Sequence, residues 1–282
     1  MSETTVNPAE FPHLSLVDLD RGNLIETLWR PNEVLFALCQ GEDQFSIVPE
    51  IEVNGAITKP RDVRHFVEQK LLFLPSDIGD YSTQEDLIRD IISFVHRYAD
   101  VPAFWEELIA HYILMTWMYD RFTATPYLRF LGEPGTGKTR IQQVCGRLCY
   151  KGMFVAGSIS AAGIFRLCDA VRGTLVVDEG DFRSAGDWSD IVKVLNQGYM
   201  AGAPILRCEG EHGRYDLRGY VVFGPKLIAT RNRFDTDALE TRCLTLQTTR
   251  VRLRSDIPLQ LPLTFEAEAC ALRNRLLRWR FR

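Results

Sequence analysis

Residues 128–139 read LRFLGEPGTGKT, and this stretch decides how the rest of the chain is interpreted. It satisfies the pattern G-x-x-x-x-G-K-[ST], with an apolar run before it and a helix-compatible run, 140–150, after it. Its glycines allow backbone turns that other residues avoid, so successive N–H groups can point at phosphate oxygens. The N-terminus of the following helix adds a partial positive charge beneath the same anion. The stretch therefore predicts a strand, a phosphate-binding loop and a helix.

The residue types in the loop indicate which side chains would contact a nucleotide. Lys138 is expected to reach the β- and γ-phosphates, and the Thr139 hydroxyl is expected to hold Mg²⁺. ATP and Mg²⁺ are therefore the predicted cofactors. The predicted nucleotide-binding residues are Gly132, Glu133, Pro134, Gly135, Thr136, Gly137, Lys138, Thr139 and Arg140.

Strand and helix patterns alternate along the chain from residue 127 onward. This alternation is typical of an α/β fold, in which a parallel sheet carries helices on both faces. Ligands of such sheets bind beyond the carboxyl ends of the strands, so catalytic residues should follow strands directly. We expect strands at 127–131, 152–156 and 173–177, and helices at 138–150, 160–171 and 187–200.

Two adjacent acids follow the third of these strands. Residues 173–177 read GTLVV, and Asp178 and Glu179 come next. Asp178 lies 40 residues after Lys138. We expect Asp178 to hold the Mg²⁺ and Glu179 to polarise the attacking water. An apolar run that ends in two acids is a weak signal alone, but its distance from the phosphate-binding loop makes it a strong one.

Composition places the protein among soluble globular chains. Of its 282 residues, 46% are hydrophobic and 25% are charged. Its seven cysteines lack paired CxxC spacing, so we interpret them as reduced thiols of a cytoplasmic protein rather than as a disulfide frame or zinc site. Residues 1–20 are polar and do not resemble a signal peptide, and the apolar run 108–119 is too short to span a bilayer. No membrane partner is therefore expected.

The chain divides into four parts by pattern. Residues 33–57 suggest a strand-rich element with one hairpin, and helices are expected at 83–98 and 102–122. The second helix is apolar nearly all round, so it should be sandwiched between other elements. The parts are a small mixed N-terminal region (1–75), a helical adaptor (76–122), an ATPase core (123–250) and a partial C-terminal helical lid (251–282).

From about residue 125 to about residue 248 the chain resembles the AAA+ ATPases. Residues 226–232, KLIATRN, look like the fourth core strand of that family followed by its sensor-1 residue. The resemblance implies that Asn232 contacts the γ-phosphate or orients the lytic water. The fold class that we predict is therefore a P-loop NTPase core of the AAA+ type, preceded by the mixed N-terminal region and the helical adaptor.

Residues 237–243, DALETRC, look like the helix end that carries the arginine finger of the same family. The resemblance implies that Arg242 acts in trans on the ATP of a neighbouring subunit, within a homo-oligomeric ring. A planar cation near the γ-phosphate would stabilise the charge of the transition state. An ordinary salt bridge with Asp237 or Glu240 is the alternative. Together, the predicted catalytic residues are Lys138, Glu179, Asn232 and Arg242.

Residues 203–223 have the pattern of two strands joined by a charged tip that contains glycine. A hairpin at this place is similar to the DNA-contacting hairpin of superfamily III helicases and minichromosome-maintenance-like helicases. The resemblance implies that four side chains touch DNA phosphates, namely Arg207, His212, Arg214 and Arg218. Glu209 and Glu211 oppose a polyanion, so a surface hairpin without nucleic-acid contact remains the alternative.

A looser resemblance extends to uncharacterised ATPases of bacterial mobile elements, through residues 119–120, 125–128 and 224–226. An AAA+ module also needs a helical lid, often with a second sensor arginine. The one plausible helix after the core is 265–279, and the sequence does not separate its candidates Arg273, Arg275 and Arg278.

Charge is distributed unevenly along the chain. Residues 205–282 carry 15 Lys and Arg against nine Asp and Glu, a net of +6, which leaves −10 for the remainder of a chain with a total of −4. Such asymmetry suggests a polyanion partner for the basic part, and a solvated arginine-rich helix is the alternative.

The function that these patterns favour is ATP hydrolysis coupled to DNA remodelling or unwinding, as in a mobile-element or replicative helicase. One alternative is a nucleotide-dependent switch that loads a protein partner without unwinding. Another is a metabolic P-loop kinase, against which the sensor-1 and arginine-finger matches argue.

Overall fold

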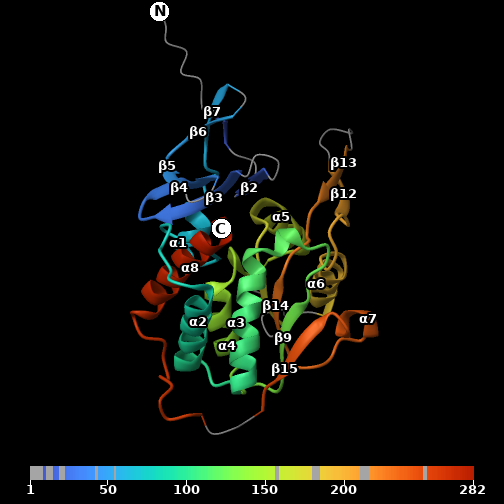
Figure 1. Ribbon diagram of the computed structural model, residues 1–282. Helices are drawn as coiled ribbons and strands as arrows, with labels where there is room; N and C mark the ends of the chain where they lie inside the picture. Colours follow the sequence, from blue (N-terminus) through green and yellow to red (C-terminus); the bar gives the residue numbers. More distant parts are fainter. Residues whose placement is uncertain are drawn as a thin grey trace, which may run out of the picture.

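A six-stranded sheet lies at the centre of the computed structural model (Figure 1). Its strand order is β15-β9-β14-β11-β10-β8, and all neighbours are parallel except β8, which runs antiparallel to β10. The strands are β8 (Leu72–Phe73), β9 (Tyr127–Leu131), β10 (Gly152–Val155), β11 (Leu175–Asp178), β14 (Lys226–Thr230) and β15 (Cys243–Gln247). The structure describes residues 9–10, 15–18, 23–41, 44–53, 55–155, 159–179, 185–209, 216–249 and 253–282.

Alternate side chains of the strands divide between two hydrophobic cores. Leu128 and Phe130 of β9 join one core, and Tyr127 of the same strand joins the other. Because both faces are covered, β9 and β14 are buried along their whole length and contain nearly continuous apolar runs. The predicted α/β fold with helices on both faces is therefore confirmed at this level. The first core contains α2 (Gln84–Tyr98), α3 (Ala103–Trp117), α4 (Lys138–Leu148) and α8 (Phe265–Phe281), and the second contains α5 (Ala161–Val171) and α6 (Ala185–Gln197).

The two adaptor helices form where the sequence predicts them. Thr83 caps α2, since its side chain accepts a hydrogen bond from the Asp86 backbone N–H at 3.1 Å. Helix α3 packs against α2, α4 and α8, which explains why it is apolar nearly all round. It ends at Trp117, earlier than expected, and a 3₁₀ turn, η1 (Tyr119–Arg121), follows. Within the described residues, no helix combines the length and apolar character that crossing a membrane requires.

The N-terminal region is built from short strands and one short helix. One sheet has the antiparallel order β2-β3-β4-β5, and another has the order β1-β7-β6. β8 belongs to neither, because it pairs with β10 at the edge of the central sheet. The central sheet thus extends across the expected boundary at residue 75. The elements are β1 (Ala9–Glu10), β2 (Ser15–Asp18), β3 (Asn23–Arg30), β4 (Glu33–Gln40), β5 (Phe45–Val48), β6 (Ile51–Val53), β7 (Ala56–Lys59) and α1 (Arg64–Glu68).

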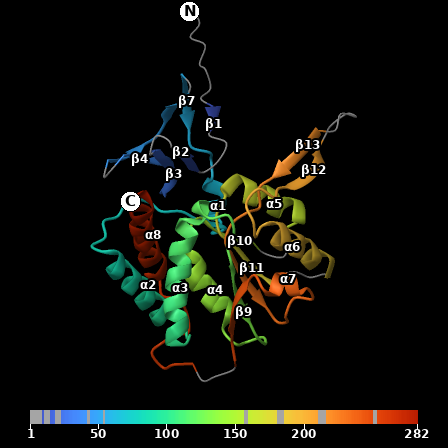
Figure 2. The same ribbon diagram turned by 45° about the vertical axis from the view of Figure 1, so that its right-hand side comes forward.

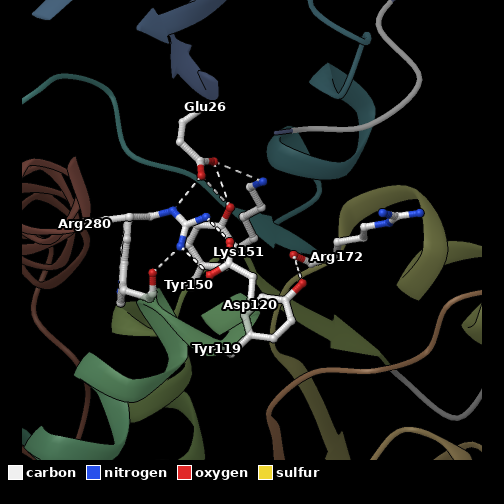
Figure 3. A network of polar contacts seen from close by, with 8 residues as sticks. Glu26, Tyr119, Asp120, Tyr150, Lys151, Arg172 and Arg280 are labelled. Atoms are coloured by element: carbon white, nitrogen blue, oxygen red, sulfur yellow. Dashed lines mark hydrogen bonds and ion pairs between the residues drawn. The ribbon is translucent and has the colours of Figure 1, made fainter. Parts of the chain in front are cut away.

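A buried polar network holds the N-terminal sheet on the core (Figure 3). Glu26 of β3 accepts hydrogen bonds from the Tyr150 hydroxyl at 2.7 Å and from Arg280 Nε at 2.7 Å, and its carboxylate lies 3.1 Å from Lys151 Nζ. Arg280 also pairs with Asp120 of η1 at 2.5 Å. The two acids balance the two cations, as buried charges require. The network therefore joins β3, η1, α8 and the turn after α4 at one point.

Helix α8 is part of the helical layer rather than a separate lid. Its apolar side chains pack on α2, α3 and α4, and Phe281 near its end stacks on Phe45 of β5 with ring centroids 5.7 Å apart. All three candidate sensor-2 arginines are engaged in this layer. Arg273 donates to the carbonyls of Leu74 and Arg147 and to Glu266, Arg275 pairs with Asp90, and Arg278 pairs with Asp80.

The expected hairpin is present and projects beside α5 and α6 in both views (Figure 2). Its strands are β12 (Ile205–Glu209) and β13 (Asp216–Tyr220), which form a separate two-stranded antiparallel sheet. A short helix, α7 (Asp237–Glu240), precedes β15. The tip of the hairpin, with His212 and Arg214, lies outside the described residues.

Candidate nucleotide site

The loop after β9 has the backbone geometry that its glycines allow. Gly135 and Gly137 have φ angles of 79° and 87°, in the left-handed region that other residues rarely adopt. At position 132 the constraint is space, because a Cβ there would lie 2.4 Å from the Thr248 carbonyl oxygen. Gly137 directly precedes α4, so the helix N-terminus lies beneath the loop. The loop thus presents backbone N–H groups and a helix dipole at one place.

Lys138 is buried within the loop. Its ammonium donates hydrogen bonds to the carbonyls of Gly132 at 2.5 Å and Glu133 at 2.8 Å. Burial lowers the pKa of this ammonium; the carboxylate of Asp178 acts in the opposite direction, and the charge of Arg231 lowers the pKa further. A second cation therefore lies close enough to Lys138 for the two charges to affect each other.

Asp178 at the end of β11 and Glu179, which follows it, meet the loop across a cavity of about 460 Å³, which we call the phosphate cavity. The Thr139 hydroxyl donates to Asp178 Oδ2 at 2.9 Å, and Glu179 Oε2 accepts from the Arg231 backbone N–H at 2.6 Å. The buried Gln142 of α4 donates to the Val177 carbonyl at 2.7 Å, which fixes the helix against β11. The cavity is lined by Pro134, Gly135, Gly137, Lys138, Thr139, Arg140, Asp178, Glu179, Thr230 and Arg231.

Thr139 and Asp178 fit the donor set that Mg²⁺ uses beside a nucleotide. Magnesium is usually held by one or two carboxylates together with substrate phosphates and water, rather than by a cage of protein ligands. The described part of the chain has no cluster of three or more His, Cys, Asp or Glu side chains suited to a metal. The hydroxyl and the carboxylate lie side by side at the edge of the phosphate cavity, where such an ion would bind.

A second cavity of about 750 Å³ adjoins the other side of the loop, and sequence reasoning missed it. The two cavities share Gly135, Gly137 and Arg140, so they meet at the loop. The volume is that of an ordinary small-molecule pocket. Its walls come from the loop and α4, from the end of β15 and the residues after it, and from two distant segments, 100–102 and 253–259.

Segment 253–259, which we call the strap, is held against the pocket from two sides. Arg140 donates to the carbonyls of Pro258 at 3.2 Å and Leu259 at 2.6 Å. The Arg254 backbone N–H donates to Asp100 at 3.1 Å, and its guanidinium lies 3.7 Å from Glu106. Arg140, which the sequence assigned to nucleotide contact, therefore has its guanidinium on the strap.

The predicted sensor-1 position differs from its neighbours. Asn232 is exposed and does not line the phosphate cavity, whereas Thr230 and Arg231 do. The sequence signal for Arg231 was available, because it is a cation that directly follows a strand at the carboxyl edge of the sheet. The role of Asn232 stays a prediction.

Arg242 lies at the opposite edge of the sheet from its own loop. Its carbonyl accepts from the Tyr127 N–H at the start of β9, whereas the loop follows the end of that strand, about 16 Å away for five residues. Its guanidinium donates to the Asn196 carbonyl at 3.0 Å and lies over the Tyr199 ring. The guanidinium of Arg242 is therefore too far from the loop of its own chain to contact a ligand there.

The salt bridge proposed as an alternative for Arg242 is made by a different arginine. Arg129, whose side chain is 2% exposed, pairs with Glu240 through both terminal nitrogens and also donates to Thr245. The hydrogen bond from Arg129 lowers the pKa of the Glu240 carboxyl. Among the described residues, Arg242 forms no ion pair with either acid that the sequence suggested.

The two described cations of the hairpin face each other. Arg207 and Arg218 are direct cross-strand partners and both are exposed. Each guanidinium lies over an aromatic ring near the base, that of Phe165 for Arg207 and that of Tyr220 for Arg218. Like charges directly opposite each other repel, so a bound anion would relieve them.

The arginine excess near the C-terminus is largely matched within the chain. Arg275, Arg278 and Arg280 of α8 pair with acids from residues 26–120. Basic residues of the C-terminal helix thus form salt bridges with acidic residues from the N-terminal half of the sequence. These salt bridges correct the alternative of a solvated arginine-rich helix, and a polyanion partner for residues 205–282 stays a prediction.

No protein-family model and no curated protein matches the sequence. Among solved structures, the chain is similar to the apo A form of the NrS-1 C-terminal region, with 10% identity and a TM-score of 0.39 over 90% of this chain and 66% of that one. It is also similar to an inhibitor-bound JCV helicase, with 14% identity and a TM-score of 0.36 over 70% of this chain and 54% of that one. The chain spans about half to two thirds of the length of these proteins. The function proposed for this chain rests on its own residues.

Proposed function

We propose that this protein binds ATP with Mg²⁺ and hydrolyses it to ADP and phosphate. The observation that carries the proposal is the meeting of Thr139, Asp178 and Glu179 with Lys138 around one cavity at the carboxyl edge of the sheet. A glycine-rich loop, a helix N-terminus and a lysine supply positive potential for phosphates. The paired hydroxyl and carboxylate supply a magnesium site beside them.

The residues divide the work by chemistry. Lys138 exchanges the loop carbonyls for β- and γ-phosphate oxygens. Thr139 and Asp178 hold Mg²⁺, which when bound neutralises phosphate charge. Glu179 accepts a proton from the water that attacks the γ-phosphorus, and the bond to the β–γ bridging oxygen breaks so that ADP leaves. The N–H of Arg231 holds Glu179 in place for this step.

The larger cavity on the other side of the loop takes the nucleoside. It is contiguous with the phosphate cavity through Gly135, Gly137 and Arg140. Its walls combine apolar and polar side chains, and Asp100, Gln247 and Thr248 are among the polar groups that could orient a base and a ribose.

ATP binding tests this assignment through Lys138→Ala, with Lys59→Ala on the exposed face of β7 as the matched control. Loss of a charge-assisted contact to the phosphates should weaken ATP binding by at least about tenfold, measured by calorimetry. The control should remain within about threefold of the wild type. Equal affinities for Lys138→Ala and the wild type would refute the phosphate-loop assignment.

We further propose that hydrolysis drives remodelling or unwinding of DNA by a homo-oligomer. Two features support this proposal. Arg207 and Arg218 present paired cations on a projecting hairpin. Arg242 lies at the edge of the sheet opposite its own loop, so a role for it in hydrolysis would have to be played on the ATP of a second subunit.

A second candidate is a switch that acts on a protein partner, and the other face of the hairpin favours it. Leu206 and Leu217 lie on that face and are 57% and 66% exposed. ATP turnover with and without DNA separates the two candidates. Acceleration by DNA supports the motor, and turnover that ignores DNA supports the switch.

A further inference from the structure

The phosphate cavity is lined by an arginine whose side chain the proposed mechanism does not use. Arg231 follows the last residue of β14 and lines the cavity with Lys138 and Glu179. Within the described part of the chain, its side chain forms no hydrogen bond or ion pair. Its backbone N–H alone is engaged, in the bond to Glu179.

The backbone at Arg231 is fixed although its side chain is exposed. Thr230, the preceding residue, is buried, and β14 pairs with β9 on one side and with β11 on the other. The 2.6 Å bond to Glu179 then holds the Arg231 amide against the end of β11. The backbone atoms from which the Arg231 side chain extends are therefore fixed beside Glu179, the expected water-polarising residue.

Three other arginines near the site already have partners for their side chains. Arg129 pairs with Glu240, Arg140 holds the strap, and Arg242 contacts Asn196 at the far edge of the sheet. Among the described residues around the cavity, Arg231 thus has a planar, bidentate donor group that is left to meet phosphate oxygens. A guanidinium matches phosphate geometry better than an ammonium does, and charge builds up on the γ-phosphoryl oxygens during transfer.

We propose that Arg231 contacts the γ-phosphate of ATP bound in its own subunit, and that this contact distinguishes ATP from ADP and stabilises the transition state. The inference rests on the proposed ATP hydrolysis. It adds a cation in cis to the one that Arg242 would supply in trans, and it assigns a role to a residue that the family resemblance left out.

The test compares Arg231→Met with Arg233→Met, which removes the same charge from an exposed residue two positions along and outside the cavity. Affinities for ADP and for a non-hydrolysable ATP analogue are measured together with turnover. For Arg231→Met we expect analogue affinity to fall by about tenfold or more and turnover by about a hundredfold or more, with ADP affinity within about threefold. Arg231→Lys should recover part of both losses.

The outcomes separate two failures. If the wild type and Arg233→Met bind and hydrolyse ATP, and Arg231→Met does the same with an unchanged ratio of analogue to ADP affinity, the Arg231 inference is wrong and the proposed function stands. If the wild type neither binds nor hydrolyses ATP, both fall. Thermal unfolding of each variant shows that losses come from the site, because an exposed side chain without a partner should leave stability unchanged.

Discussion

Lys226 offers a test of how the hairpin is anchored to the sheet. Its side chain is 1% exposed, and its ammonium donates to three carbonyls, those of Gly198, Val222 and Gly224, at 2.9 to 3.3 Å. No carboxylate forms an ion pair with it in the described ranges. The ammonium thus ties the end of α6 to the residues that follow the hairpin, and the three carbonyl dipoles and the Tyr127 ring lie against its charge.

The titration of Lys226 sets how strongly the stability of the folded protein depends on pH. Burial lowers the pKa of Lys226 from 10.5 to about 8. Between these values the unfolded chain holds a proton that the folded chain has lost, so raising the pH from 8 towards 10.5 favours folding. A difference of roughly 2.5 units corresponds to about 3 kcal/mol. Below pH 8 the protonated lysine therefore costs the folded state about that much relative to alkaline solution.

Urea unfolding of the wild type and of Lys226→Met, from pH 7.5 to pH 10, isolates this effect. Other groups titrate equally in both proteins and cancel in the difference. The neighbouring Cys168 stays largely neutral over this range, because burial raises the pKa of its thiol to about 11. Between pH 7.5 and pH 10 the free energy of unfolding of the wild type should rise by about 2 to 3 kcal/mol relative to that of Lys226→Met. A difference that stays constant with pH would refute the lowered pKa and the anchoring argument built on it.

Three further predictions concern the candidate site and its partners. Arg242→Ala should bind ATP normally and hydrolyse it about a thousandfold more slowly; mixing it with Lys138→Ala should restore some turnover if subunits share sites. Replacing both Arg207 and Arg218 by alanine should reduce the salt-dependence slope of DNA binding by about 1.4 to 1.8, with basal turnover unchanged. Arg254→Ala should release the strap, which would show as faster proteolysis at 253–259 and weaker ATP binding by about tenfold.

Local sequence patterns were sufficient to predict the parts of the fold that are formed by continuous stretches of the chain. The strand, loop and helix at 127–148 and the strand that ends at Asp178 depend on neighbours within a few residues, so periodicity and glycine spacing were sufficient. The meeting of Thr139 with Asp178 also followed, because the carboxyl ends of parallel strands meet at one edge.

Contacts between segments that are distant in sequence could not be predicted from local patterns. Nothing adjacent to Arg129 indicates that a charged residue inside an apolar strand has its partner 111 residues away at Glu240. The strap and the second cavity likewise depend on where the chain returns after β15, which no local pattern fixes. The short antiparallel β8 was missed because two residues are too few to show a period.

The salt bridges of α8 could not be predicted from the charge pattern along the chain. Arg275 pairs with Asp90 of α2, and Arg278 pairs with Asp80, which precedes that helix. The acidic and basic halves of the sequence attract each other once the chain folds. Linear charge counts do not contain this information.

The most direct measurement of the central claim is a single turnover of ATP with and without Mg²⁺ by the wild type, Glu179→Gln and Asp178→Asn. Glu179→Gln should bind ATP with Mg²⁺ as the wild type does and hydrolyse it about 10² to 10⁴ times more slowly, because only the water-polarising carboxylate is lost. Asp178→Asn should instead lose the magnesium-dependent part of ATP binding. Wild-type turnover that persists in Glu179→Gln, or identical behaviour of the two variants, would contradict the assignment of the phosphate cavity as an ATP-hydrolysing site.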